Sequence, residues 1–368
     1  MSRVLHVISG LGTGGAETYL SMLSADLSRR GIDQHVFSLS GGGPIVERFE
    51  RCAISLTLAD LRRDPLRAVS ALLRRTKEFN PDVIQGWMYH GDIAATLAHK
   101  MAAPKNCKLF WGIRCSDMDL AKYSRQLRLT VQACIAASGL PDLVIANSEA
   151  GKIAHLSRGY RPKNWAVIHN GVDLERFQPD IELRRQVREE LRVEHDTPVA
   201  FHVARLDPMK GHSVLIDAFQ KLRKREGDNL QVFLVGQGTE QLTLPRGMYA
   251  LGRRNDIARL LTGGDIIVSS SLSEGFPNAI AEGMACGLSP VASDVGDTGL
   301  LLKGVSIPNP PGDADALANA LLTSVKNVKE RGYVPDVAAR SAMENNFSSF
   351  SASEKFERLY KNRCYAEI

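Results

Sequence analysis

The sequence contains no long apolar run. No stretch reaches the roughly 18 residues that a membrane-spanning helix requires. The N-terminal stretch carries one basic residue, Arg3, followed by a short apolar segment. Such a start is typical of a buried first strand and does not have the length or flanks of a signal peptide. The sequence therefore predicts a cytoplasmic protein.

Cysteine is scarce and irregularly spaced. No pair has Cys-x-x-Cys spacing and none belongs to a Cys/His array; the six residues are Cys52, Cys107, Cys115, Cys134, Cys286 and Cys364. This pattern predicts reduced, mostly buried thiols in a cytosolic protein. It argues against a structural zinc site, and we expect no metal and no other cofactor.

Length and composition indicate a soluble globular protein of two domains. The chain has 368 residues, which is more than one hydrophobic core usually serves. Hydrophobic residues make up 44% and charged residues 24%, which are ordinary values. The formal net charge is +5. We expect no nucleic-acid partner.

The positive charge is concentrated in the first half of the chain. Residues 1–180 hold 23 Lys and Arg against 17 Asp and Glu, whereas the remainder holds 23 against 24. Two groups stand out, the second with a three-residue repeat that shares one helix face; they are Arg62, Arg63, Arg67, Arg74, Arg75 and Lys77, and Lys122, Arg125 and Arg128. They are either solvated helix faces or a surface that meets anionic lipid or an acidic acceptor.

Short apolar runs alternate with amphipathic stretches in two series. The first predicts strands at 4–9, 34–39, 82–85, 108–111 and 143–147, and helices at 16–29, 66–79, 91–101 and 124–137. The second predicts strands at 198–203, 230–235, 265–270 and 288–292, and helices at 211–224, 255–261, 277–286, 314–324 and 351–361. Repeated β-α-β units imply parallel sheets covered on both faces.

We therefore expect an α/β fold with two doubly wound Rossmann-like domains facing each other across a cleft. The charged segment 173–196 is the predicted linker region. Ligands of doubly wound sheets bind beyond the carboxyl ends of the strands. The cleft between the domains is thus the expected site.

A glycine-rich loop, residues 10–15, follows the first predicted strand and opens the first helix. Glycines let the backbone pass close to a ligand, and a helix N-terminus favours an anion. The spacing matches the dinucleotide fingerprint Gly-x-Gly-x-x-Gly. That fingerprint also needs an acid after the second strand, and residues 38–43 contain none. The loop contacts a phosphate or sugar, or forms a tight turn without a ligand; a dinucleotide site fits least.

Two cations, Arg205 and Lys210, lie five residues apart after a strand of the second series. Arg can hold phosphate oxygens bidentately and Lys supplies a point charge, so this loop suits a diphosphate. The alternative is a loop with solvated cations. Gly236 and Arg253 lie in two further turns of the second series, and each turn is a weak signal by itself.

The strongest pattern is the segment 270–287, which holds two glutamates. Glu274 lies in a loop before a predicted helix, and Glu282 lies on that helix. Carboxylates accept hydrogen bonds from sugar and ribose hydroxyls, while backbone amides near the helix start suit a phosphate; these belong to Gly275, Phe276 and Asn278. The alternative is that Glu274 caps the helix and Glu282 is a surface residue.

Together these residues resemble the retaining glycosyltransferases of family 4, which have the GT-B fold. The resemblance covers nearly the whole chain and rests on the order of its motifs. These are Gly14-Gly15-Ala16-Glu17, Asn147-Ser148, residues 168–173, Arg205 with Lys210-Gly211, residues 235–238, the Glu-x7-Glu stretch with residues 284–287, Val295-Gly296 and Gly312-Asp313.

The resemblance implies a role for each motif. Arg205 and Lys210 would bind the donor diphosphate, Glu274 the donor sugar hydroxyls, and Glu282 the ribose. Cations and a helix N-terminus would replace a metal, and transfer would retain the anomeric configuration. Further donor contacts are expected from Gly14, Gly15, Gly236, Arg253, Gly275, Phe276, Asn278 and Ala279.

The resemblance also implies domain boundaries and a role for each domain. Residues 1–175 would form the acceptor-side domain, 176–350 the nucleotide-sugar-binding domain, and 351–368 a helix that crosses back to the first domain. The expected function is a retaining hexosyltransferase that moves a sugar from a UDP-linked donor. Its acceptor is a glycan or lipid-linked molecule in surface-polysaccharide biosynthesis, with peripheral attachment at the inner membrane face.

One motif departs from the family pattern. Many members carry a histidine after the strand predicted at 108–111, whereas this chain has Gly112-Ile113-Arg114-Cys115 there. Arg114 is one candidate to replace that histidine as a catalytic contact, and His90 is the other. A lone histidine is also compatible with a structural role.

Three other functions stay open on the sequence. A sugar-nucleotide epimerase on the same fold would need no acceptor. A nucleotide-sugar sensor would bind without turnover. An oxidoreductase is the weakest reading, because no acid ends the second strand.

Overall fold

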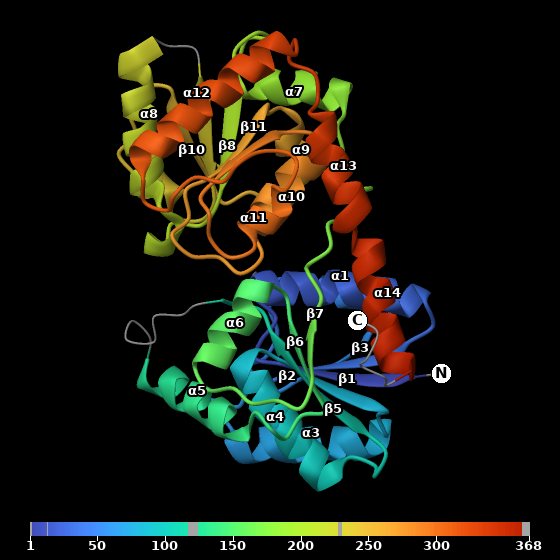
Figure 1. The fold of residues 1–368 in the computed structure, drawn as a ribbon. Helices are drawn as coiled ribbons and strands as arrows, with labels where there is room; N and C mark the ends of the chain where they lie inside the picture. Colours follow the sequence, from blue (N-terminus) through green and yellow to red (C-terminus); the bar gives the residue numbers. More distant parts are fainter. Residues whose placement is uncertain (1, 13, 117–123, 227–229, 363–368) are drawn as a thin grey trace. The chain divides into compact units, whose positions relative to one another are not determined.

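The computed structural model describes residues 2–12, 14–116, 124–226 and 230–362. They form two compact units (Figure 1). The first unit comprises Met1–Asn170 and Phe350–Ile368, and the second comprises Gly171–Ser349. The sequence pattern had indicated boundaries at 175/176 and 350/351. The second unit is thus an insertion into the first, and the chain passes between them twice.

The two passages lie close together in the second unit's own structure. The backbone amide of Val172 donates to the carbonyl of Phe347, and the amide of Ser349 donates to the carbonyl of Val172, both at 2.8 Å. A Cβ on Gly171 would lie 2.4 Å from the Cα of Ser349, so only glycine fits at this approach.

The described part of the first unit contains a seven-stranded parallel sheet in the order β3-β2-β1-β4-β5-β6-β7. Its strands are largely buried on both faces in the centre of the sheet, as expected of parallel sheets, and exposed or half-buried at the β3 edge. They are β1 (Arg3–Ile8), β2 (Asp33–Ser38), β3 (Ser55–Leu58), β4 (Val83–Trp87), β5 (Lys108–Ile113), β6 (Leu143–Ala146) and β7 (Trp165–Val167).

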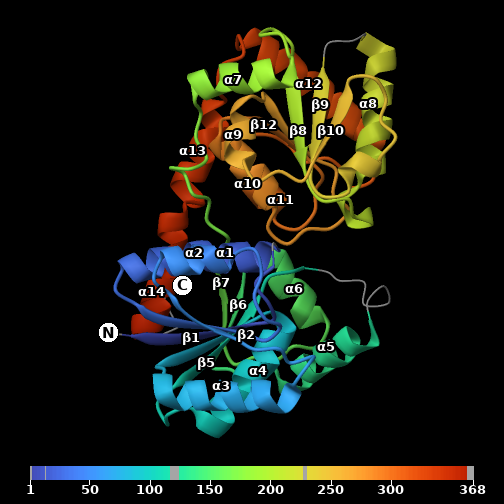
Figure 2. The same ribbon diagram turned by 180° about the vertical axis from the view of Figure 1, so that it is seen from behind.

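Helices cover both faces of this sheet (Figure 2). One face packs against α1 (Gly15–Arg29), α2 (Val46–Arg51) and α14 (Ser349–Asn362). The other packs against α3 (Pro65–Phe79), α4 (Met88–Ala102) and α5 (Arg125–Ala137). A further helix, α6 (Glu149–Ser157), follows β6. The helix α14 contributes Phe356, Leu359 and Tyr360 to the core, and the Tyr360 hydroxyl donates to Gln85 Oε1 at 2.5 Å.

The second unit has a five-stranded parallel sheet in the order β10-β9-β8-β11-β12 within the described residues. The strands are β8 (Val199–Val203), β9 (Gln231–Val235), β10 (Met248–Gly252), β11 (Ile266–Ser269) and β12 (Ser289–Ala292). The order runs outward from β8 in one direction and from β11 in the other, so the β8/β11 pair is the switch point of this sheet.

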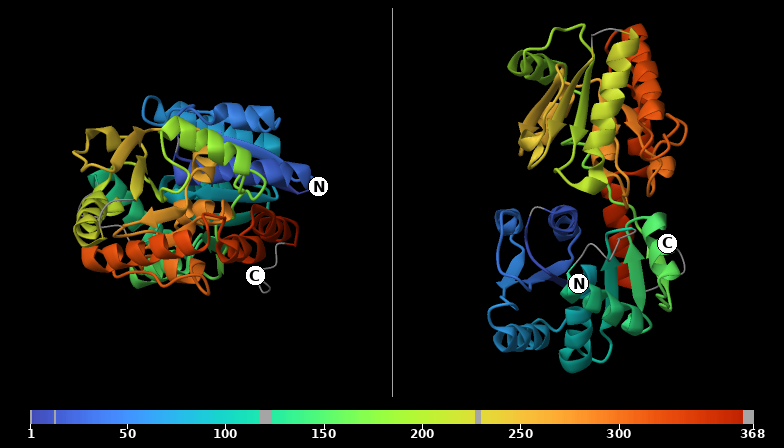
Figure 3. Two further views of the ribbon diagram at one scale, coloured as in Figure 1. Left: turned by 90° about the horizontal axis from the view of Figure 1, so that it is seen from above. Right: turned by 90° about the vertical axis from the view of Figure 1, so that its left-hand side faces the viewer.

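Helices lie on both sides of these strands as well (Figure 3). The helices α8 (His212–Glu226) and α12 (Ala314–Glu330) cover one face. The other face packs against α7 (Ile181–Leu191), α9 (Ile257–Thr262), α10 (Asn278–Ala285), α11 (Thr298–Leu301) and α13 (Val337–Asn346). The prediction of two doubly wound α/β domains is confirmed.

The interpretation of 173–196 as a linker segment is wrong, because α7 occupies its centre. The Asp180 side chain caps this helix by accepting from the amide of Leu183. Two arginines of α7, Arg184 and Arg188, reach the nearly buried carboxylate of Asp265, at 2.6 and 3.4 Å. The charge density of the segment therefore reflects an ion-paired helix.

Candidate functional site

The candidate site in the second unit is built from loops that follow its parallel strands. Because the strands are parallel, these loops all leave the same edge of the sheet. Ala204 N–H donates to Val235 O at 2.9 Å, and Leu206 N–H donates to Gln237 O at 2.8 Å. Gly236 is one of the predicted donor contacts. A Cβ on this residue would lie 2.1 Å from Ala204 O, so the close approach of the two loops requires glycine here.

The loop after β8 presents both predicted cations. Arg205 has a 68% exposed side chain, and its Nη2 lies 2.9 Å from Asp207 Oδ2. Asp207 Oδ1 accepts from the amide of Met209 at 2.9 Å and so caps the short 3₁₀ helix η2, Pro208–Lys210. Gly211 then takes a left-handed conformation with φ of 62°. Its Cβ would fall 2.0 Å from Ser270 O, so the two loops approach closely here.

Hydrogen bonds and an ion pair join the β8 loop to the loop after β11, and a further hydrogen bond lies within the β11 loop. The Ser270 hydroxyl donates to Gly211 O at 2.9 Å, and Leu272 N–H donates to Met209 O at 2.8 Å. Lys210 Nζ lies 2.5 Å from Glu274 Oε1. Ser271 Oγ donates to the same carboxylate oxygen at 2.7 Å. Lys210 and Glu274, predicted from separate motifs, are therefore in direct contact.

The alternative role of Glu274 as a helix cap is wrong. The helix α10 begins at Asn278, and the residue at its N-cap position is Pro277, with no side-chain hydrogen bond to the helix. The Glu274 carboxylate instead bonds Lys210 and Ser271.

Glu282 lies on α10 and is not an ordinary surface acid. Burial raises its pKa from 4.5 to about 7, and the positive charge of Arg176 opposes that shift only in part. One turn later on the helix, burial also raises the pKa of Cys286 to about 12. Burial thus brings the pKa of Glu282 close to neutral pH.

The remaining predicted donor contacts in this unit have mixed environments. Phe276 is buried against Phe347, with ring centroids 5.6 Å apart, so its ring belongs to the core. The Asn278 amide donates to Phe276 O at 3.0 Å, inside the loop. Gly275 O accepts from Asp297 N–H at 3.0 Å. Ala279 lies in the first turn of α10, and exposed Arg253 follows β10.

In the first unit, Gly14 is the N-cap of α1 and Gly15 is the first residue of that helix. A Cβ on Gly14 would lie 2.3 Å from Glu17 Oε2, so the Glu17 carboxylate folds back over the helix start. An anionic ligand at this terminus would meet that carboxylate as a neighbour.

Arg114 follows β5 and is enclosed by aromatic rings. Its guanidinium lies 4.4 Å from the Tyr19 ring centroid, 4.6 Å from that of Trp87 and 5.6 Å from that of Phe356. Its Nη1 donates to Asn170 Oδ1 at 2.9 Å. Burial lowers the pKa of Arg114. The side chain therefore braces Asn170, the residue at which the chain first leaves the first unit.

His90 lies in the first turn of α4 and is partly buried. Its Nε2 is 3.4 Å from Thr130 Oγ1 on α5. Burial lowers its pKa, and the nearby positive charge of Arg62 acts in the same direction. The ring is therefore neutral near pH 7. His90 and Arg114 contact different helices and are not equivalent substitutes for one another.

Sequence reasoning missed three residues that shape the site. Asp207 pairs with Arg205, Ser271 bonds Glu274, and Arg176 acts on Glu282. The Asp-Pro step before the short helix is a recognisable N-cap signal and could have identified Asp207. The other two contacts depend on loop geometry that sequence spacing does not specify.

Two features are absent from the residues that the structure describes. No helix there combines the length and apolar character needed to cross a membrane. No group of three or more His, Cys, Asp or Glu side chains is arranged there to hold a metal ion.

Two family models match the chain in tandem. A Glycosyltransferase Family 4 model matches residues 13–176, and a Glycosyl transferases group 1 model matches residues 197–327. The D-inositol 3-phosphate glycosyltransferase of Rhodococcus erythropolis is 26% identical over 362 residues, covering 83% of this chain and 79% of the relative.

Two further proteins bear on the fold and on the ligand class. The UDP-Gal:alpha-D-GlcNAc-diphosphoundecaprenol alpha-1,3-galactosyltransferase of Escherichia coli is 28% identical over 244 residues, 61% of each chain. The crystal structure of Anabaena Alr3699/HepE in complex with UDP and glucose superposes with a TM-score of 0.83 at 22% identity, covering 98% of this chain and 100% of that chain. The chain is therefore a glycosyltransferase with the GT-B fold, and its residues 13–176 match the model of family 4.

Proposed function

We propose that the protein transfers a hexose from a UDP-linked donor, with retention of anomeric configuration, and that the loops of the second unit hold the donor. The observation that carries this proposal is the cluster of Arg205, Lys210 and Glu274 at the switch point of the sheet. Support for UDP comes from two proteins: the Anabaena structure contains it, and the E. coli relative is named for it.

The cations fit a diphosphate. The exposed fork of Arg205 can take two phosphate oxygens, and Lys210 provides a compact charge beside it. Their charge would stabilise the diphosphate as the sugar departs, without a metal. The leaving phosphate would then assist deprotonation of the acceptor on the same face of the sugar, which gives retention.

The two glutamates would hold the hydroxyl groups of the donor. Lys210 and Ser271 both contact one oxygen of the Glu274 carboxylate and so fix its position in the loop, from which the carboxylate would accept from a sugar hydroxyl. Glu282 would accept from the ribose. Backbone groups from residues 275 to 279 would meet the phosphates and the sugar, with Gly236 and Arg253 completing the donor contacts.

The acceptor proposed is a glycan or lipid-linked molecule of surface-polysaccharide biosynthesis. The E. coli relative, whose name includes a diphosphoundecaprenol, supports this class. The first unit would contribute the Gly14-Gly15 loop over the donor. His90 is the stronger candidate there for a catalytic contact, because Arg114 is enclosed by aromatic rings.

The donor assignment is tested by Lys210→Ala, Arg205→Ala and Glu274→Gln. Calorimetry with UDP and transfer assays with a panel of nucleotide sugars would measure each variant. We expect at least tenfold weaker UDP binding for Lys210→Ala, since a hydrogen bond to a charged group contributes about 1.5–3 kcal/mol. Lys329→Ala, which removes an exposed cation at the end of α12, is the control. Unchanged binding by Lys210→Ala would refute the assignment.

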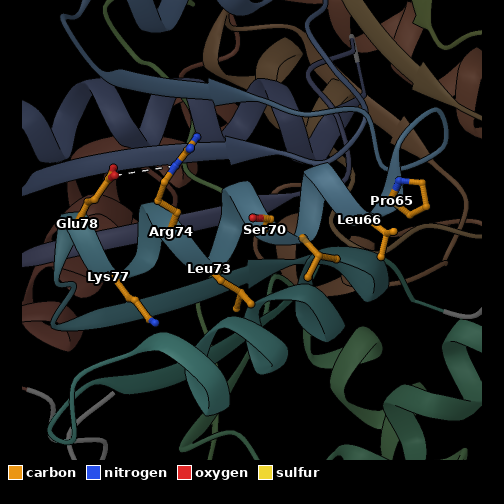
Figure 4. Close-up of a pocket in the computed structure, with 8 residues that line it drawn as sticks. Pro65, Leu66, Ser70, Leu73, Arg74, Lys77 and Glu78 are labelled. Carbon is orange, nitrogen blue, oxygen red and sulfur yellow. Dashed lines mark ion pairs between the residues drawn. The ribbon is translucent and has the colours of Figure 1, made fainter.

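We further propose peripheral attachment of the first unit to an anionic membrane surface through α3. This helix lines a shallow groove that mixes apolar and charged residues: Pro65, Leu66, Val69, Ser70, Leu73, Arg74, Lys77 and Glu78. Leu66 is 84% exposed. Figure 4 shows Leu66, Leu73 and Lys77 on one side of the helix, with Arg74 and Glu78 on the other. Arg62, Arg63 and Arg67 are exposed close by, and Lys122 of the second basic group lies outside the described residues.

Flotation with vesicles tests the attachment. Vesicles with a substantial phosphatidylserine fraction should carry the protein at low salt and release it at about 0.5 M salt, because screening shortens the electrostatic range. Pure phosphatidylcholine vesicles should not carry it. A variant with Arg67, Arg74 and Lys77 changed to Ala should float less than wild type. Equal flotation with both lipids would contradict the proposal.

A further inference from the structure

Each cation of the proposed diphosphate site has a carboxylate partner in the loops that form the site. Arg205 pairs with Asp207, and Lys210 pairs with Glu274. The four charges sum to zero. A diphosphate would therefore be a second anion for cations that are already neutralised, and the stability of the existing pairs affects its affinity.

The two carboxylate oxygens of Asp207 accept hydrogen bonds from different groups. Oδ1 accepts from the amide of Met209 at 2.9 Å, which fixes the carboxylate at the start of η2. Oδ2 accepts from Arg205 Nη2 at 2.9 Å and lies 3.3 Å from its Nε. The loop thus holds the carboxylate in place whether or not Arg205 is bound to it.

The two partners also differ in exposure to solvent. The side chain of Arg205 is 68% exposed, whereas that of Asp207 is 26% exposed. Arg205 can therefore turn from Asp207 to a phosphate, while Asp207 stays beside the site with its negative charge. An exposed pair of this kind is weak, so the exchange costs little.

We propose that Asp207 is a positioning residue that holds Arg205 in the donor-free enzyme and favours release of the nucleoside diphosphate product. This inference rests on the proposed function. In a nucleotide sugar the second phosphate is esterified to the sugar, whereas in free UDP it is a terminal phosphate that carries most of a second charge near pH 7. The fixed charge of Asp207 consequently repels UDP more strongly than the donor.

Asp207→Asn tests this directly, because the amide oxygen can still cap η2 while the charge is lost. Calorimetry would use UDP, UDP-glucose and uridine as probes. We expect binding of UDP to tighten about fivefold, the size of one exposed ion pair. Binding of UDP-glucose should tighten less, and that of uridine should not change. UDP should also inhibit transfer at a correspondingly lower concentration.

Two further variants keep the test decisive. Asp207→Ser retains a capping hydroxyl and should behave like Asp207→Asn. Asp217→Asn removes an exposed acid of α8 and should leave all three affinities unchanged. Weaker or unchanged UDP binding in both Asp207 variants would overturn the inference, as would equal tightening for uridine. Failure of the wild-type protein to bind UDP or UDP-glucose would instead refute the proposed function.

Discussion

Replacing Glu282 by Gln tests how burial affects both stability and donor binding. Burial raises the pKa of Glu282 from 4.5 to about 7 in the folded protein. Between these values the folded state binds more protons than the unfolded state, so stability falls as pH rises. The difference corresponds to about 3 kcal/mol when fully developed near pH 8.

The effect on the free energy of unfolding is measured by urea unfolding at pH 5 and pH 8. At pH 5 Glu282 is largely neutral in the folded state, so wild type and Glu282→Gln should be similar. At pH 8 the variant should gain up to about 3 kcal/mol relative to wild type. Glu330→Gln, at the exposed end of α12, should show no such gain. A Glu282→Gln difference that is the same at both pH values would refute the reasoning.

The expected pH dependence of donor binding follows from the ribose contact proposed for Glu282. A ribose hydroxyl bonds more strongly to the charged carboxylate, so binding should strengthen as pH rises through about 7. UDP-glucose is the suitable probe, because its esterified phosphates do not titrate in this range. Burial lowers the pKa of His202, on β8, to about 3, so that residue does not titrate there either. The pH dependence should vanish in Glu282→Gln, and its persistence would contradict the ribose assignment.

Three other predictions concern stability and can be checked by thermal or urea unfolding. Gly236→Ala should destabilise by about 1–3 kcal/mol, because its Cβ would meet Ala204 O; a neutral effect would mean that the strand ends can separate freely. Arg114→Met should cost about 1–2 kcal/mol through loss of its contacts with three aromatic rings, and an unchanged midpoint would argue against that bracing role. Asp265→Asn should cost about 3–5 kcal/mol, because the buried Arg188 loses its carboxylate; a loss below about 1 kcal/mol would show that the carbonyl groups around Arg188 suffice.

Much of the fold follows from local patterns. The apolar runs and their turns predicted β1, β2 and β8 within one residue at each end, because buried parallel strands are nearly continuous in apolar side chains. The charged segment around α7 misled the prediction, since its buried arginines meet an acid about 80 residues later in the chain. Sequence spacing does not reveal such a long-range pair.

The candidate site was predictable in its parts and less so in its connections. Arg205, Lys210 and Glu274 follow from strand-end position and charge. The direct contact of Lys210 with Glu274 depends on β8 and β11 being neighbours, and strand order is not encoded locally. Arg114 was predicted as a catalytic contact, and its enclosure could not be foreseen because the rings around it come from three distant segments, α1, β4 and α14.

The insertion of the second unit has a consequence for synthesis of the chain. The core of the first unit includes Phe356, Leu359 and Tyr360, which leave the ribosome after the whole second unit. The second unit can therefore close its own core early, whereas the first must wait with part of one sheet face uncovered for about 180 residues of further translation. The last helix, α14, therefore completes the core of the first unit at the end of synthesis. Removing that single helix would deprive the first unit of part of its hydrophobic core.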